Sequence, residues 1–144
     1  LVGQGAAAIS AGATANDSDM AWAESILGAV GTVVRVPESQ LDAVTGLAGS
    51  GPAYLFLVAE SLIKAGVVAG LSQDDSEALV AQLFVGSAAL LKERGEPADL
   101  RKMVTSPGGT TAAGLRVLDD SGVREAFVEA VLAAKARSIE LGRG

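Results

Sequence analysis

The segment from Pro52 to Ala69 restricts the possible folds of this chain more than any other part of the sequence. Read as a helix, it has apolar side chains around nearly its whole circumference: Ala53, Tyr54, Leu55, Phe56, Leu57, Val58, Ala59, Leu62, Ile63, Val67 and Val68. Such a helix is expected to be covered on all sides. In a chain of 144 residues this favours homodimerisation through interleaved helices, in which a second copy covers what one chain leaves exposed. The alternative is a central core helix of a monomer.

The composition supports a folded domain and excludes several classes of function. Hydrophobic residues make up 49% of the chain, enough for a buried interior. There are 11 basic and 17 acidic residues and no basic cluster that could neutralise a run of phosphates, so nucleic acid is not an expected partner. The sequence has no cysteine and no histidine, which excludes disulfides, a cysteine nucleophile, a histidine general base and an ordinary zinc site within this chain. No metal site is predicted.

The sequence also carries signals about location. No stretch has the charged start, apolar middle and small-residue cleavage site of a secretory signal. The apolar segment ending near Gly70 contains Glu60 and Lys64, so we expect no membrane span and predict a cytoplasmic protein. The chain opens at Leu1 without a methionine or a lead-in, and we expect it to be part of a longer protein.

Periodicity divides the chain near Pro37. Residues 1–36 contain a short apolar run at 6–10, an amphipathic helix at 18–30 and a β-branched strand at 32–36, a βαβ-like unit too small to bury itself. Residues 37–144 are predicted to be almost entirely helical, so the expected fold class is mainly α. The predicted helices are a short one around Leu41 and Val44, then 52–69, 78–92 with a Ser72 cap before it and Gly95 after it, 97–103, 111–119 and 123–141.

Two glycine-rich stretches imitate nucleotide-binding loops. Gly3–Ala8 matches the pattern G-x-G-x-x-A, but the residues after Gly5 are expected to form a strand and not a helix, so no cofactor-binding residue is predicted there. Gly46–Pro52 begins like a phosphate loop, yet Pro52 stands where a lysine would have to reach the phosphates. This second stretch is either a tight turn that leads into a helix or a loop that also lines a ligand site.

The third glycine cluster predicts an anion site. Gly108 and Gly109 allow unusual backbone dihedrals and close approach of a ligand, and they are flanked by the hydroxyls of Ser106, Thr110 and Thr111. The threonines stand where a helix is expected to begin, and the first amides of a helix lack partners within it and carry the positive end of its dipole. A carboxylate or phosphate fits such a position. The alternative is an ordinary turn between helices with a Ser or Thr cap.

Two separated motifs give the chain a family resemblance. The residues are Thr45-Gly46-Leu47-Ala48-Gly49-Ser50-Gly51-Pro52-Ala53-Tyr54 and Val104-Thr105-Ser106-Pro107-Gly108-Gly109-Thr110-Thr111, followed by Gly114-Leu115 and Leu118-Asp119. Their order and spacing closely resemble Δ1-pyrroline-5-carboxylate reductase, from Leu1 to about Leu141. By this resemblance, residues 1–36 are the end of a Rossmann-type nucleotide-binding domain and residues 37–144 are a helical dimerisation and substrate-binding domain.

The resemblance implies NAD(P)H-dependent reduction of L-1-pyrroline-5-carboxylate to L-proline. It implies that Ser106, Gly108, Gly109, Thr110 and Thr111 bind the substrate carboxylate, and that Thr111 is catalytic, contacting the ring nitrogen and orienting the imine. It also implies a homodimer, allows rings of dimers, and places each active site between the nucleotide domain of one subunit and the helical domain of its neighbour.

One departure from the family is large. The family's glycine-rich nucleotide loop lies in its N-terminal part, and nothing here matches it, so this chain alone is expected to bind neither NADPH nor NADH well and to be inactive. Two alternatives remain open. One is the helical domain of another Rossmann-type reductase, such as a 3-hydroxyacid dehydrogenase, and the other is an oligomerisation or small-carboxylate-binding module.

Overall fold

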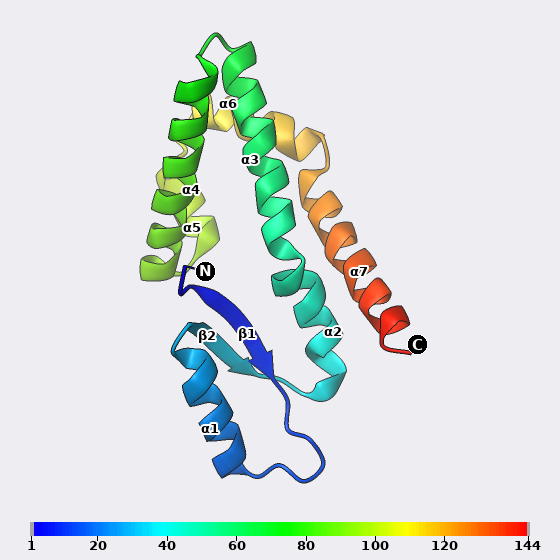
Figure 1. Cartoon of the computed structure of the whole chain (residues 1–144). Helices are drawn as coiled ribbons and strands as arrows, with labels where there is room; N and C mark the ends of the chain where they lie inside the picture. Colours follow the sequence, from blue (N-terminus) through cyan, green and yellow to red (C-terminus); the bar gives the residue numbers. More distant parts are fainter. Residues whose placement is uncertain (1, 144) are drawn as a thin grey trace. The chain divides into compact units, whose positions relative to one another are not determined.

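The computed structural model describes residues 2–143 and shows a mainly α chain with a short two-stranded start (Figure 1). The chain divides into two compact units. The first contains the segment through Pro52 together with the segment from Phe127 onward, and the second contains Ala53–Ala126. The predicted domain boundary at residue 37 falls inside the first unit. That boundary separates the nucleotide-binding part, residues 1–36, from the helical part, residues 37–144, and it stays a prediction.

The first unit begins with a strand, a helix and a parallel strand. β1 (Gly5–Ile9), α1 (Asp17–Gly28) and β2 (Gly31–Arg35) follow the predicted order with small shifts of their ends. The strands pair in register from Gly5 opposite Gly31 to Ile9 opposite Arg35. Helix α1 starts one residue before the predicted Ser18, because Asn16 caps it by accepting the amides of Ser18 and Asp19.

An ion pair links α1 to β2 within this unit. The Nε and Nη2 atoms of Arg35 donate to the two carboxylate oxygens of Glu24 at 2.6 and 2.7 Å. Hydrogen bonding by the guanidinium lowers the pKa of Glu24, and the carboxylate in turn raises the pKa of Arg35. Both side chains are partly exposed, so this fork orients the helix on the strand more than it stabilises the unit.

The glycine-rich stretch that resembled a phosphate loop is helical. After η1 (Glu38–Gln40) and α2 (Leu41–Val44), the chain forms a π-helical turn, η2 (Thr45–Gly49), and continues into α3 (Gly51–Val68). The expectation of a tight turn or a loop was wrong. The reason is that a single π turn, in which the amide of Ser50 donates to the carbonyl of Thr45 at 2.9 Å, accommodates the glycines without ending the helix.

The C-terminal helix α7 (Val123–Leu141) approaches this turn closely. A Cβ atom added to Gly46 would lie 2.7 Å from the carbonyl oxygen of Val131 and 3.1 Å from the amide nitrogen of Lys135. The hydroxyl of Ser138 also donates to the carboxylate of Asp42 at 2.6 Å, which joins α7 to α2. Glycine at position 46 is therefore required by the close crossing of two backbones.

The second unit contains most of α3 and the helices α4 (Gln73–Arg94), α5 (Pro97–Met103) and α6 (Thr110–Asp120). Ser72 caps α4 as predicted, accepting the amide of Asp75 at 3.0 Å, but α4 begins at Gln73 and not at Ala78. α3 and α4 cross closely, because Gly66 lies against Ser76, whose side chain is buried and donates to the carbonyl of Ser72.

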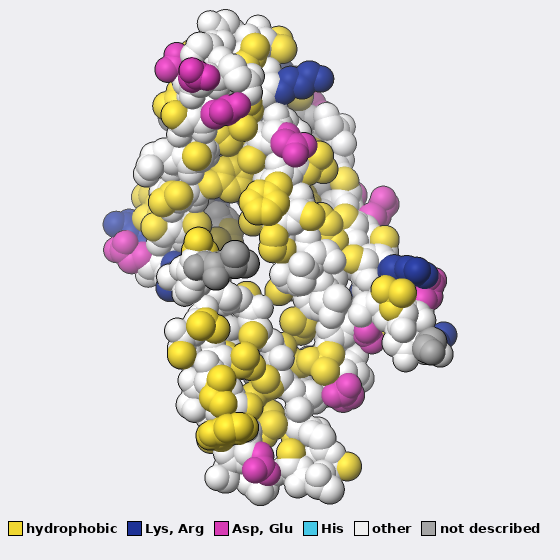
Figure 2. All heavy atoms as spheres, in the orientation of Figure 1, with side chains coloured by type: hydrophobic (Ala, Val, Ile, Leu, Met, Phe, Trp, Pro, Cys, Tyr) yellow, Lys and Arg dark blue, Asp and Glu magenta, His cyan; other side chains and the backbone are white. Residues whose placement is uncertain are grey.

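A single chain buries very little apolar surface. Of the hydrophobic residues described in 2–143, Met20 and Val80 are buried. On α3, Leu55, Phe56 and Leu57 are 54%, 68% and 63% exposed. Figure 2 shows hydrophobic side chains over much of the visible face. The alternative of a core helix inside a monomer is therefore wrong for this chain, since its own helices do not cover α3.

Candidate functional site

The predicted anion site lies between α5 and α6. Gly108 has a φ of 70°, in the left-handed region that favours glycine, and it turns the chain toward the start of α6. Gly109, at the N-cap of α6, has extended backbone with φ −77° and ψ 174°. The amide of Gly109 donates to the carbonyl of Ser106 at 3.1 Å, which closes the turn. The loop is thus a compact turn with its geometry fixed by its own backbone.

A residue larger than glycine at position 109 would displace a neighbouring side chain. A Cβ atom at this position would overlap the hydroxyl oxygen of Ser106 and would lie 3.2 Å from the carbonyl oxygen of the same residue. The serine side chain therefore occupies the space that any larger residue at position 109 would need.

The first amides of α6 are available to a ligand. The amide of Ala113 donates to the carbonyl of Gly109 at 3.1 Å and is the first in α6 to reach an acceptor one turn back. The three preceding amides, of Thr110, Thr111 and Ala112, have no acceptor within the helix. No side-chain hydrogen bond caps this helix in the structure, and its first turn carries no acidic residue. A carboxylate at this end would accept hydrogen bonds from these three amides and would lie at the positive end of the helix dipole.

The structure brings the predicted site residues together. Ser106, Gly108, Gly109, Thr110 and Thr111 all lie in the turn and the first residues of α6, and apart from half-buried Gly109 they are exposed. Thr105 differs from these residues in having its hydroxyl occupied. That hydroxyl donates to the carbonyl of Arg101 at 2.6 Å, near the C-terminal end of α5. The roles of these residues toward a ligand, including the catalytic role of Thr111, stay predictions.

The Gly3–Ala8 motif lacks the strand, turn and helix of a dinucleotide site. Dinucleotide sites need a glycine-rich turn that follows a strand and opens a helix, so that the diphosphate meets a helix N-terminus. Here Gly5 begins β1 itself, and Ala6–Ile9 continue that strand. The residues after Gly5 therefore form a strand, as the sequence predicts, and the absence of a cofactor-binding residue at Gly3–Ala8 stays a prediction.

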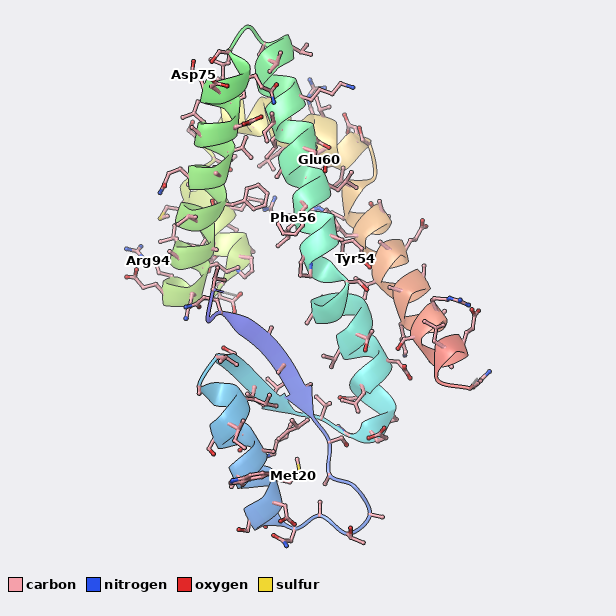
Figure 3. All side chains as sticks on the ribbon, in the orientation of Figure 1. Met20, Tyr54, Phe56, Glu60, Asp75 and Arg94 are labelled. Carbon is pink, nitrogen blue, oxygen red and sulfur yellow. The ribbon has the colours of Figure 1, made fainter. Side chains whose placement is uncertain are left out.

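A further surface of the second unit is apolar and open. A groove of about 400 Å³ runs between α3 and α4. Its lining is almost free of polar atoms and consists of Leu55, Leu83, Phe84, Ser87, Ala88 and Leu91. Figure 3 labels Tyr54, Phe56 and Glu60 on α3. The helical stretch Glu38–Val68 is long and apolar enough to cross a membrane by length and composition alone, and none of its most apolar window is buried.

Sequence reasoning missed the π-helical turn. Its only signal was the spacing of Gly46, Gly49 and Gly51 before Pro52, which equally fits a loop. π turns inside α-helices occur frequently at functional sites. A functional role for this turn is therefore worth testing.

Comparison with known proteins adds to this geometry. Residues 38–141 match the protein family described as pyrroline-5-carboxylate reductase dimerisation. The pyrroline-5-carboxylate reductase of Synechocystis sp. is 50% identical over 143 residues, covering 99% of this chain and 54% of that protein. The enzyme of the same name from Methanosarcina acetivorans is 45% identical over 143 residues, covering 99% of this chain and 53% of that protein.

Solved structures give the same family. A pyrroline-5-carboxylate reductase from Coxiella burnetii has a TM-score of 0.93 and 40% identity over 97% of this chain and 53% of that one. A Plasmodium falciparum pyrroline carboxylate reductase, solved with NADP bound, has a TM-score of 0.88 and 35% identity over 98% of this chain and 54% of that one. The chain thus spans about half the length of the relatives it matches. With the family matched over residues 38–141, the chain belongs to the pyrroline-5-carboxylate reductase dimerisation family.

Proposed function

We propose that this chain supplies the dimerisation and substrate-binding part of a pyrroline-5-carboxylate reductase, which reduces L-1-pyrroline-5-carboxylate to L-proline with NADPH or NADH. The observation that carries the proposal is the exposed, uncapped start of α6 behind the Ser106–Gly109 turn, located inside the region that matches the family. This site offers three amides without acceptors to the carboxylate that substrate and product share.

The residues of the turn would act mainly by positioning. The amides of Thr110, Thr111 and Ala112 would hold the ring carboxylate through charge-assisted hydrogen bonds, with the hydroxyl of Ser106 beside them. Thr111 would then orient the ring nitrogen of the protonated imine. The nicotinamide, when bound by the complete enzyme, supplies the hydride, so the chain needs no histidine for this reaction. Its own contribution is orientation and a suitable electrostatic environment.

Residues 1–36 are proposed to be the last part of the nucleotide-binding domain. The parallel pairing of β1 and β2 around α1 supports this, because two strands alone do not form an independently stable sheet. The family match begins at residue 38, directly after this region. With no helix-opening glycine loop at Gly3–Ala8, the chain alone is expected to bind NADPH or NADH poorly and to be inactive.

The chain is proposed to form a homodimer through its helical part. The family description names dimerisation, and the exposed apolar residues of α3 and the groove beside α4 need a cover that one chain does not provide. A second copy is a better cover for Glu38–Val68 than lipid, because Asp42, Glu60 and Lys64 interrupt its apolar surface. A cytoplasmic location follows from this reading. The exposed residues Phe127, Val128 and Leu132 on α7 support further association into rings of dimers.

A chimera tests the proposed activity. Joined to the N-terminal half of the Synechocystis relative, the chain is expected to oxidise NADPH in the presence of pyrroline-5-carboxylate, whereas the 144-residue chain alone is not. Thr111→Ala in the chimera should lower kcat/KM about 100-fold, within the range given by positioned groups that bind or protonate a reacting atom.

The control is Thr105→Ala, since the hydroxyl of Thr105 is used at the end of α5 and does not face a ligand in this proposal. A folded, dimeric chimera that binds proline but shows no reduction would favour a carboxylate-binding module and contradict the reductase proposal. Equal loss in both variants would argue against a role specific to Thr111.

A further inference from the structure

The chain passes between its two compact units at two places, and both lie beside an irregularity of the backbone. The first passage follows Pro52, directly after the π-helical turn η2 and the bend at Ser50. The second precedes Phe127, four residues after the start of α7, which itself follows Gly122 with a φ of 68°. At each passage, the helix is interrupted within a few residues on at least one side.

The backbone hydrogen bonding is irregular at the first passage. Within η2 the amide of Ser50 reaches back five residues to Thr45, and so it does not form the usual α-helical bond. Pro52 has no amide hydrogen and cannot donate to the carbonyl of Ala48. Gly49 and Gly51 add the largest backbone freedom of any residue type. From Gly51 onward α3 continues to Val68, so the interruption is confined to a few residues.

The chain is held tightly on each side of this interruption. On the first unit's side, Gly46 lies against the backbone of α7 at Val131, and Asp42 accepts a hydrogen bond from Ser138. On the second unit's side, Gly66 of α3 lies against Ser76 of α4. At this passage, any movement between the units would be taken up between these crossings, where the helix contains the π turn and Pro52; at the other passage it would be taken up near Gly122, before α7 begins. We propose that Gly49–Pro52 is a hinge about which the two units reorient.

Such a hinge has a use in the reaction proposed above, and this part of the inference rests on that proposed function. The turn Ser106–Gly109 and the start of α6 belong to the second unit, whereas β1, α1 and β2 belong to the first. Reorientation at Gly49–Pro52 would change the position of the substrate turn relative to the strands. Hinges of this kind are short segments that absorb changes in φ and ψ while the parts on either side stay rigid.

Alanine substitution tests the hinge without disturbing packing. A Cβ atom at Gly49 has its nearest neighbour, Cγ2 of Thr45, at 3.7 Å, and a Cβ atom at Gly51 has no neighbour within 4 Å. The double variant Gly49→Ala with Gly51→Ala therefore stiffens the backbone and fits sterically. The matched control is Gly86→Ala, in the middle of α4, where a Cβ atom also has no neighbour within 4 Å.

The first readout is hydrogen exchange on the complete 144-residue chain. Amides at 49–55 should exchange faster than those in the rest of α3, and the double variant should slow them at least about fivefold. Gly86→Ala should leave them unchanged. Protection at 49–55 equal to that of the rest of α3 in the natural sequence would overturn the proposal.

The second readout is the distance between the units. The sequence has no cysteine, so Ser18→Cys in α1 and Glu93→Cys in α4, both exposed, give a clean pair of spin labels. With the labelled chain diluted into unlabelled chain, the distance distribution should be broad, narrow in the double alanine variant, and stay broad in Gly86→Ala. A single narrow distance in the natural sequence would also overturn the hinge. Neither readout depends on reductase activity, so the hinge and the proposed function can fail separately.

Discussion

Replacing Gly46 by alanine is expected to destabilise the chain by about 1–3 kcal/mol, the usual cost of overpacking a close contact. The new methyl group would lie 2.7 Å from the carbonyl oxygen of Val131 and 3.1 Å from the amide nitrogen of Lys135. Both atoms belong to the backbone of α7, which cannot move aside as a side chain would. The helices must separate instead, and this also strains the hydrogen bond between Asp42 and Ser138. Thermal unfolding should shift down by several degrees, at roughly 2–4 °C per kcal/mol for a chain of this size.

Gly86→Ala is the control for this measurement. It makes the same chemical change inside a helix but meets no atom within 4 Å, so it should be neutral or stabilise by up to about 1 kcal/mol through helix propensity. Both variants need the same chain concentration, because dimerisation adds to apparent stability. A Gly46→Ala protein as stable as the natural one would mean that α7 does not approach the π turn as the structure has it.

Replacing Phe56 by aspartate is expected to convert the dimer into a monomer. Phe56 is 68% exposed in the single chain, so the substitution removes little packing within one copy. In the proposed dimer the same side chain would be covered, and an unpaired carboxylate there would carry a large desolvation cost. Loss of an aromatic hot spot alone costs at least about 2 kcal/mol, which is roughly a 30-fold weaker dimer. Light scattering should give twice the 14.3 kDa chain mass for the natural sequence and the single mass for the variant.

Val30→Asp is the matched control, because it places the same charge on another exposed hydrophobic residue, at the turn before β2. It should leave the mass at that of the dimer. If Phe56→Asp stayed a dimer while folded, the interface would have to exclude this face of α3. If the natural chain were a monomer, the exposed apolar surface of α3 would need another partner.

Most of the secondary structure could be predicted from the sequence, because the local signals agree with one another. A run of β-branched residues predicted β2, Ser72 was predicted as a cap although the helix after it was expected to begin at Ala78, and Pro97 stood at the first position of α5. The start of α6 at the two threonines followed from the glycines before it. These features depend on short-range chemistry, which a sequence displays directly.

Other features depend on contacts that no local pattern reveals. The π turn at Thr45–Gly49 reads equally well as a loop, because glycine permits both and only the crossing with α7 distinguishes them. Likewise the overlap that a Cβ atom at position 109 would make with the hydroxyl of Ser106 depends on the path of the turn and not on residue type alone. The position of these residues at the start of a helix could thus be predicted, the close contacts within the turn could not, and their role as a site stays a prediction.

The most direct test of the account is an NMR titration of L-proline into the 144-residue chain. Proline carries the carboxylate and ring nitrogen that the site is proposed to bind. The amides of Thr110, Thr111 and Ala112 should shift in a saturable way, and Gly109→Ala, which displaces the Ser106 hydroxyl, should weaken this binding at least about tenfold. A folded chain whose α6 amides do not respond to saturating proline, or respond equally in Gly109→Ala, would contradict the assignment of this turn as the substrate site.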